Sequence, residues 1–112
     1  MNTCGTIRPT THALDRFRQR VLPLLPEETR AEYRKNSQMK HLFNRVQLYT
    51  ENFHQAHDGL IKANVFLNLD GLPPIPLTFV LNPMNNLVIT LYIQCGWEVT
   101  YKSGEMEWRW SI

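Results

Sequence analysis

The first part of the chain has the spacing of an amphipathic helix. Between residues 9 and 24, apolar residues recur at intervals of three and four, the period of a helix with one buried face. Thr10 and Thr11 precede this pattern, and their hydroxyls can cap the free amides at a helix start. The pattern predicts a first helix from about Thr11, closed by Pro23 and Pro26. Its buried face consists of Ala13, Phe17, Val21 and Leu24.

A second helical stretch is predicted to begin at Pro26, because proline and the acidic residues Glu27 and Glu28 suit a first helical turn. Asn36 and Ser37 mark a weak point where this helix breaks or kinks. Helical spacing then returns and defines a second buried stripe, made of Met39, Leu42, Phe43, Val46 and Tyr49.

In the second half of the chain the period changes to two, as in half-buried strands. Residues 61–67 alternate between apolar and polar side chains. Segments 77–81 and 87–93 are two further predicted strands, joined by the asparagine-rich reversal 82–86, since asparagine tolerates left-handed backbone conformations. Residues 70–76 contain three prolines, which remove three donors, so we expect a connection there.

The register of the last hairpin follows from its side chains if Ser103 and Gly104 form the turn. Cross-strand charge pairs and aromatic pairs each contribute about 0.2–1 kcal/mol, and a slip of one residue would destroy both sets. One side pairs Lys102 with Glu105, Glu98 with Arg109 and Thr100 with Glu107, and the other pairs Tyr101 with Met106, Val99 with Trp108 and Trp97 with Trp110.

These elements predict a single α+β domain over residues 1–112, with two N-terminal helices packed on a four- to five-stranded antiparallel β-meander. A chain of 112 residues buries about two-thirds of its unfolded surface, enough for a core. Hydrophobic residues make up 43% and charged residues 20%, which excludes a disordered chain, and no apolar run can cross a bilayer. Without a secretory pattern at the start, we expect a cytosolic protein with Cys4 and Cys95 as free thiols.

Two turns at Cys95 and Gly96 are compatible with the sequence. A simple two-residue turn places Tyr92 opposite Val99 and continues the sheet, whereas a bulge at Gly96 flips the last hairpin and buries its aromatic residues. The simple turn puts Leu77, Phe79, Leu81, Leu87, Ile89 and Leu91 under the helices. It leaves an open reverse face of Val80, Val88, Tyr92, Trp97, Val99, Tyr101, Trp108 and Trp110, rich in residue types favoured at interface hot spots.

Charge is unevenly distributed along the chain. Residues 1–49 hold nine Lys or Arg and four Asp or Glu, a net charge of +5, whereas residues 50–112 hold three bases and six acids, a net charge of −3. Such an asymmetry marks either a surface that meets an anionic partner or surface helices that carry arginine. If the partner is RNA, the candidate contacts are Arg8, Arg16, Arg20, Arg34, Lys35, Lys40 and Arg45.

His12, Arg16 and Arg20 are spaced by four and therefore form one polar row on the first helix. A histidine that moves a proton beside arginines that stabilise a charged phosphorane is an arrangement suited to RNA cleavage. In the alternative interpretation, the arginines are ordinary helix formers on a solvated face and His12 supports the capping turn.

The motif Ile7-Arg8, Thr11-His12-Ala13 and Arg16, followed by helices and a meander that contains residues 87–92, resembles small prokaryotic and phage proteins of the barnase/colicin/RelE ribonuclease-toxin superfamily. The resemblance implies an α+β fold and RNA cleavage without metal, commonly by basic and aromatic side chains of the sheet and C-terminal segment. The strands here offer only Lys62, Lys102 and Arg109 as basic residues, and the hairpin register pairs two of them with acids. The candidates carried over therefore lie on the first helix.

His54, His57 and Asp58 could present two imidazoles and a carboxylate to a metal. The alternative is a helix C-terminus, where partly positive rings meet free carbonyls. The sequence contains no glycine-rich phosphate loop, no serine elbow and no Cys-x-x-Cys motif, so no cofactor is expected.

Two functions therefore follow from the sequence. The first is binding or metal-independent cleavage of RNA by a RelE-like protein through its basic helical face. The second is a non-enzymatic protein-binding module, such as a phage or mobile-element inhibitor of a host complex. Its partner would be an antitoxin, a host complex or a second copy in a homodimer, held by Tyr92, Trp97, Tyr101, Trp108 and Trp110.

Overall fold

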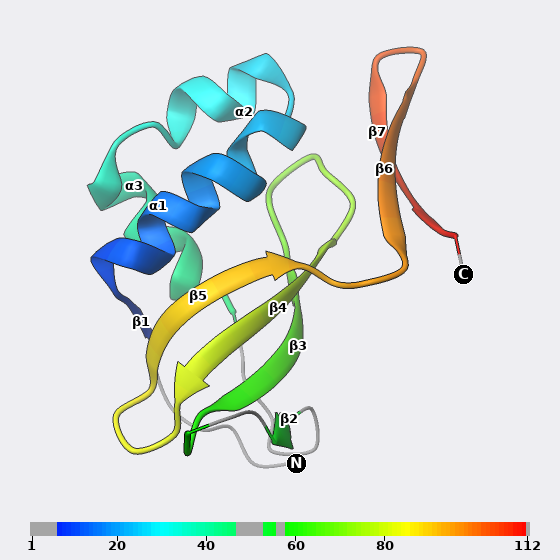
Figure 1. Cartoon of the computed structure of the whole chain (residues 1–112). Coiled ribbons are helices and arrows are strands. Elements are labelled where there is room, and N and C mark those ends of the chain that lie inside the picture. Colours follow the sequence, from blue (N-terminus) through cyan, green and yellow to red (C-terminus); the bar gives the residue numbers. More distant parts are fainter. Residues whose placement is uncertain (1–6, 47–52, 56–57, 112) are drawn as a thin grey trace.

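The computed structural model describes residues 7–46, 53–55 and 58–111, and it shows an α+β fold (Figure 1). The helices are α1 (Thr11–Arg20), α2 (Glu27–Glu32) and α3 (Asn36–Phe43), with a 3-10 turn at Leu22–Leu24. The strands are β1 (Arg8–Pro9), β2 (Phe53–Gln55), β3 (Ile61–Leu67), β4 (Ile75–Asn82), β5 (Leu87–Ile93), β6 (Trp97–Lys102) and β7 (Glu105–Trp110).

Helices α1 and α2 begin where the sequence predicts, but the structure has three helices where two were predicted. The Thr10 hydroxyl caps α1 by accepting from the Ala13 amide at 3.1 Å, and it also donates to the Val88 carbonyl at 2.9 Å. This one side chain therefore starts the helix and ties it to β5. The helix is fully broken just before the predicted weak point at Asn36 and Ser37, because α2 ends at Glu32 and α3 starts at Asn36. Tyr49, the last residue of the predicted stripe, lies outside the described residues.

The antiparallel meander is only partly correct. The main sheet has five strands in the order β1-β5-β4-β3-β2, and β1 runs parallel to β5 while the other pairs are antiparallel. Strands β6 and β7 form a separate two-stranded sheet that runs on from the end of β5 (Figure 1). The predicted pairing of Tyr92 with Val99 is therefore wrong. The Gln94 amide donates to the Pro76 carbonyl at 3.1 Å and Gly96 has a φ of +94°, so the chain turns out of the sheet there.

A register shift between Val80 and Leu81 changes which side chains of β5 face the helices. Leu81 pairs with Val88, and Phe79 pairs with Leu91, so Ile89 is the extra residue of a bulge. Val88 is consequently buried in the core rather than on the reverse face as predicted. Leu87 and Ile89, which were predicted to lie under the helices, are only half-buried.

The predicted register of the last hairpin is confirmed at every one of its six pairs. Its apolar side turns toward the rest of the molecule, since Met106 is buried and Val99 and Trp108 pack on the core. The Tyr101 hydroxyl donates to the Leu24 carbonyl and fixes the hairpin to the end of the first helical segment. Neither predicted alternative is fully met, because Trp108 packs on the core while Tyr101 is 48% and Trp110 56% exposed.

The helices pack on one face of the five-stranded sheet, and α1 lies along β5 (Figure 1). Aromatic rings join these layers, with the Phe43 centroid 6.3 Å from that of Phe17 and 5.4 Å from that of Phe79. Strand β4 starts at Ile75, earlier than predicted. Pro76 is tolerated because β5 ends opposite Leu77, so its missing amide faces no strand partner. Within the described ranges, no helix is both long and apolar enough to span a membrane.

Candidate functional site

The face of the sheet opposite the helices carries a row of polar side chains. Strand β3 alternates strictly, with Ala63, Val65 and Leu67 in the core and Lys62, Asn64 and Phe66 exposed on the other side. Alternation on a pleated strand places all three exposed side chains on one surface.

This surface contains a hollow of about 270 Å³, which we call the sheet hollow. Strand pairing assembles it. His54 of β2 is opposite Lys62 of β3, and the next row runs from Asn64 through Thr78 to Tyr92. The sheet hollow is lined by His54, Lys62, Asn64, Thr78, Tyr92, Gln94, Cys95 and Trp110.

Hydrogen bonds fix the floor of the sheet hollow. The buried Thr78 hydroxyl donates to Asn64 Oδ1 at 2.7 Å, which leaves the Asn64 amino group to donate outward. The Gln94 side-chain amide donates to the Val65 carbonyl at 3.0 Å and to the Leu77 carbonyl at 3.1 Å. The Gln94 side chain therefore forms a fixed end of the hollow, and its amide hydrogens are not available to a ligand.

Three aromatic rings, the aromatic rim, border the hollow where the last hairpin meets β3. Trp97 stands edge-on to Trp110 with centroids 5.4 Å apart and edge-on to Phe66 with centroids 6.4 Å apart. Trp110 is 56% exposed and Phe66 is 49% exposed. The edge-on contact with Trp97 holds the Trp110 ring in place while leaving much of it accessible to a planar ligand.

The side chains that line the sheet hollow include one cation and two groups that can exchange a proton. Lys62 supplies a positive charge, His54 an imidazole and Tyr92 a phenol, and the described lining contains no Asp or Glu. Such a set favours an anionic ligand with a flat apolar part, which would rest against the exposed Trp110 ring.

The predicted catalytic row on α1 is engaged within the molecule. Arg16 Nε donates to His12 Nε2 at 3.3 Å, and Arg16 also donates to the Gln19 side chain at 2.7 Å. Arg20 reaches across to the sheet and donates to the Leu91 carbonyl at 2.8 Å. His12 and Arg20 remain exposed, but these bonds give two of the three side chains a structural role.

The predicted RNA contacts are spread over several elements. Arg8 and Lys40 line one hollow where β1 meets α3, which is described further below. Arg34 and Lys35 are exposed between α2 and α3, and Arg45 is exposed after α3. Arg8 and Lys40 therefore share a cavity, whereas Arg34, Lys35 and Arg45 lie on other exposed parts of the described chain.

The predicted aromatic face is divided. Tyr92 and Trp110 line the sheet hollow, and Trp97 supports Trp110. Tyr101 is 48% exposed but tethered through its hydroxyl to the helical layer. Trp108 packs on the core, and its buried indole N–H has no acceptor among the described residues.

The metal hypothesis involved His54, His57 and Asp58. His57 lies outside the described residues, whereas His54 lines the sheet hollow and Asp58 is exposed at a turn with a φ of +59°. Among residues 7–46, 53–55 and 58–111, no group of three potential ligands is close enough to hold a metal ion.

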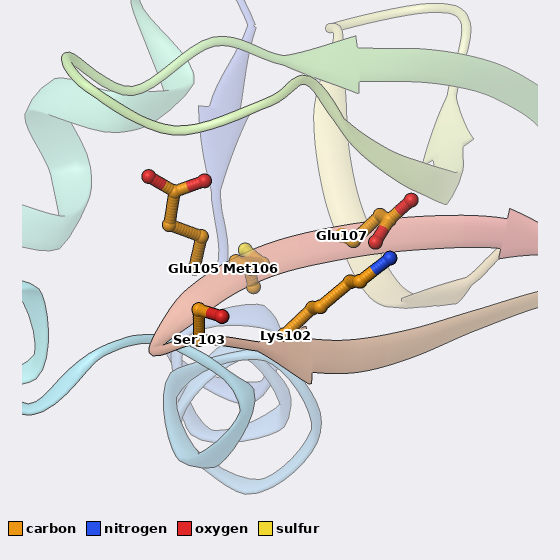
Figure 2. Close-up of a pocket in the computed structure, with 5 residues that line it drawn as sticks. All are labelled: Lys102, Ser103, Glu105, Met106 and Glu107. Carbon is orange, nitrogen blue, oxygen red and sulfur yellow. The ribbon is translucent and has the colours of Figure 1, made fainter.

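A second cavity of about 240 Å³ lies at the tip of the last hairpin (Figure 2). Figure 2 shows Lys102 and Glu107 extending to the same side of the hairpin, with Ser103, Glu105 and Met106 beside them. Two carboxylates beside one ammonium make this tip acidic, so it is a poorer place for an anion than the sheet hollow.

The sheet hollow leaves little trace in the sequence. The period of β3 does put Lys62 and Asn64 on the face away from the helices, but such alternation is normal for any solvated strand. His54 precedes the clear period-two pattern, so its pairing with Lys62 had no signal in the sequence. No protein-family model, curated protein or solved structure matches this chain.

Proposed function

We propose that this protein binds single-stranded RNA and holds one nucleotide in the sheet hollow. The observation that carries the proposal is that Lys62, His54 and the exposed Trp110 ring line one cavity with no acidic residue in its described lining. Lys62 contacts a phosphate, and the base stacks on Trp110. The outward amino group of Asn64 donates to the base edge.

The size of the sheet hollow favours an unpaired strand. At about 270 Å³ it is slightly smaller than typical small-molecule pockets, which begin at ~300 Å³, so it accommodates one nucleotide and not a duplex. Sequence-specific RNA recognition generally uses bases that are unstacked and splayed onto aromatic side chains. The aromatic rim provides such a platform on a sheet whose other face is covered by helices.

The test is a fluorescence-anisotropy titration with single-stranded and duplex RNA of equal length over a series of salt concentrations. Lys62→Ala is expected to weaken binding and to reduce the salt slope by about one, because one phosphate contact is lost. Trp110→Ala is expected to weaken binding roughly 5- to 150-fold, the cost of one stacked base. The matched controls Lys102→Ala and Met84→Ala change an exposed cation and an exposed apolar side chain outside this hollow. Unchanged affinity in Lys62→Ala would contradict the proposal.

The same hollow holds the side-chain types needed for metal-independent cleavage, and we extend the proposal to that reaction. The ribose 2′-oxygen attacks the adjacent phosphorus while the His54 imidazole accepts the 2′-hydroxyl proton. The Lys62 ammonium stabilises the extra negative charge of the phosphorane. The P–O5′ bond then breaks, and the leaving 5′-oxygen takes a proton from solvent, which gives a 2′,3′-cyclic phosphate and a 5′-hydroxyl.

Cleavage is tested with end-labelled RNA in the presence of a metal chelator. Loss of products in His54→Ala with retention in His12→Ala assigns the reaction to the sheet hollow. The reverse result assigns it to the row on α1, where His12, Arg16 and Arg20 remain the alternative candidates. Binding without cleavage in the native protein leaves RNA binding as the function.

A second candidate function is protein binding through the aromatic rim, favoured by the exposed Phe66 and Trp110 rings. The simplest partner is a second copy in a homodimer. Sedimentation velocity over a range of concentrations tests this. A dimer weakened by Trp110→Ala but unaffected by Lys62→Ala supports it, and a monomer at every concentration removes the homodimer.

A further inference from the structure

A third cavity lies at the edge of the sheet opposite to β2. It has a volume of about 230 Å³, and we call it the edge hollow. It is lined by Ile7, Arg8, Pro9, Lys40 and Asn44, none of which lines the sheet hollow. The edge hollow is therefore a separate feature, located where β1 meets the C-terminal end of α3.

The backbone around the edge hollow is firmly held. Ile7 is buried at 1% exposure, and the Arg8 amide donates to the Asn86 carbonyl at 3.0 Å, in the parallel pairing of β1 with β5. Asn44 follows α3, and its amide donates to the His41 carbonyl at 3.2 Å. The side chains of Arg8 and Lys40 consequently extend from two fixed points of the chain into one cavity.

The charge of the edge hollow is unbalanced. Within the described part of the chain, neither Arg8 nor Lys40 has a polar side-chain partner, and β1 and α3 contain no Asp or Glu. Arg45 follows Asn44 in the chain but does not line the edge hollow, so Arg8 and Lys40 supply the two charges of its described lining. The acid of α1, Asp15, is paired with Arg18 at 3.2 Å and does not offset this charge.

A purely structural role explains the presence of Lys40 in the edge hollow but not that of Arg8. Lys40 lies in the last turn of α3, where a cation interacts favourably with the helix dipole by about 0.3–1 kcal/mol. Arg8 lies on a different element, and no dipole accounts for its presence beside Lys40. Two unpaired cations that share one cavity repel each other, so an anion between them is stabilised.

We propose that the edge hollow is a binding site for a phosphate group. The planar guanidinium of Arg8 matches two phosphate oxygens, and the Lys40 ammonium adds a point charge. The Asn44 side-chain amide provides a further neutral donor. The phosphate belongs either to a free or terminal phosphomonoester or to the phosphodiester backbone of a nucleic acid. This site goes beyond the proposed nucleotide site and does not depend on it.

The experiment is a titration of the ¹⁵N-labelled full chain with inorganic phosphate, followed in ¹H–¹⁵N spectra at constant ionic strength with chloride as the reference anion. We expect saturable shifts confined to the amides around Arg8, Lys40 and Asn44. The single variants Arg8→Gln and Lys40→Gln should each weaken binding at least threefold, and the double variant should abolish it. The control Arg34→Gln removes an exposed cation outside the hollow and should bind phosphate normally.

Oligonucleotides then distinguish the two sources of phosphate. Short RNAs with and without a 5′-phosphate are titrated into a Lys62→Ala variant, in which the sheet hollow is impaired. A response that requires the 5′-phosphate identifies a phosphomonoester, and an equal response from both RNAs identifies a backbone phosphodiester. Dispersed shifts that chloride reproduces, or shifts that persist in the double variant, would overturn the proposal, whatever the outcome at the sheet hollow.

Discussion

The Thr78 hydroxyl on β4 donates to Asn64 Oδ1 on β3 at 2.7 Å, and these two residues are direct cross-strand partners. This bond joins the fold to the candidate site, because Thr78 is buried at 5% exposure while Asn64 faces the sheet hollow. A buried donor thereby sets the orientation of an exposed amide. The floor of the sheet hollow is thus preorganised by the same strand pairing that builds the sheet.

Thr78→Val tests that relationship. The substitution keeps the branched shape but removes the hydroxyl, so the free energy of unfolding should fall by about 1 kcal/mol, and RNA affinity should fall because Asn64 is released. Thr90→Val is the matched control, since Thr90 lies on β5, on the same face of the sheet as Thr78, and is half-buried. Urea unfolding followed by circular dichroism and the anisotropy assay measure the two effects. A loss of stability with full RNA affinity would show that Asn64 takes no part in binding.

Arg20 is predicted to stabilise the fold, because its guanidinium donates to the Leu91 carbonyl at 2.8 Å and links α1 to β5. Arg20→Met should lower the free energy of unfolding by about 1 kcal/mol. Arg18→Met breaks only the exposed pair with Asp15 and should change it by less than about 0.5 kcal/mol. If the two variants unfold at the same urea concentration, the contact with Leu91 is not stabilising.

Phe43 is predicted to be the most sensitive of the aromatic core positions, because its ring contacts both Phe17 of α1 and Phe79 of β4. Phe43→Ala should cost about 3–5 kcal/mol through lost burial and the cavity left behind. Phe66→Ala removes a ring that is 49% exposed and should cost far less. Thermal unfolding compares them, and similar midpoints would mean that helices and sheet are not joined through Phe43.

The local features of the fold could be predicted from the sequence. The last hairpin is the clearest case: the pairs Glu98 with Arg109 and Trp97 with Trp110 agree on one register, and the structure has it. Thr10 as the cap of α1 and the strict alternation of β3 are further local features, since each depends on neighbours in the chain. In such features the local preferences of the sequence agree with the final fold, so the sequence alone is enough to predict them.

Features that depend on contacts between distant segments could not be predicted. The bulge at Ile89, opposite Val80 and Leu81, reverses the sides of the start of β5, and the pattern of that strand fits either register because nearly all its residues are apolar. The parallel strand β1 spans only Arg8 and Pro9, too short to show a period. The sheet hollow could not be predicted for the same reason, because it brings His54 and Trp110 together from opposite ends of the second half of the chain.

Tyr101 is predicted to make the protein less stable at alkaline pH than at neutral pH. Partial burial of its ring raises the pKa of the phenol above the ordinary value of 10.0, although the nearby Arg30 opposes this increase. The neutral hydroxyl donates to the Leu24 carbonyl, and ionisation removes that donor. Because the pKa in the folded state lies above that in the unfolded state, the contribution is complete below pH 10 and is lost as the pH rises through the folded-state pKa.

At pH 7 the free energy of unfolding of Tyr101→Phe should therefore be about 1 kcal/mol lower than that of the native protein. This difference should shrink as the pH rises beyond 10. Burial and the adjacent Glu32 also raise the pKa of Tyr33, so the native protein alone would report both phenols. The comparison at each pH isolates Tyr101, because Tyr33 is present in both proteins. Tyr92→Phe serves as the control for loss of a phenol from the sheet. A difference between native protein and Tyr101→Phe that stays constant from pH 7 to pH 11 would show that the hydroxyl does not hold the hairpin against Leu24.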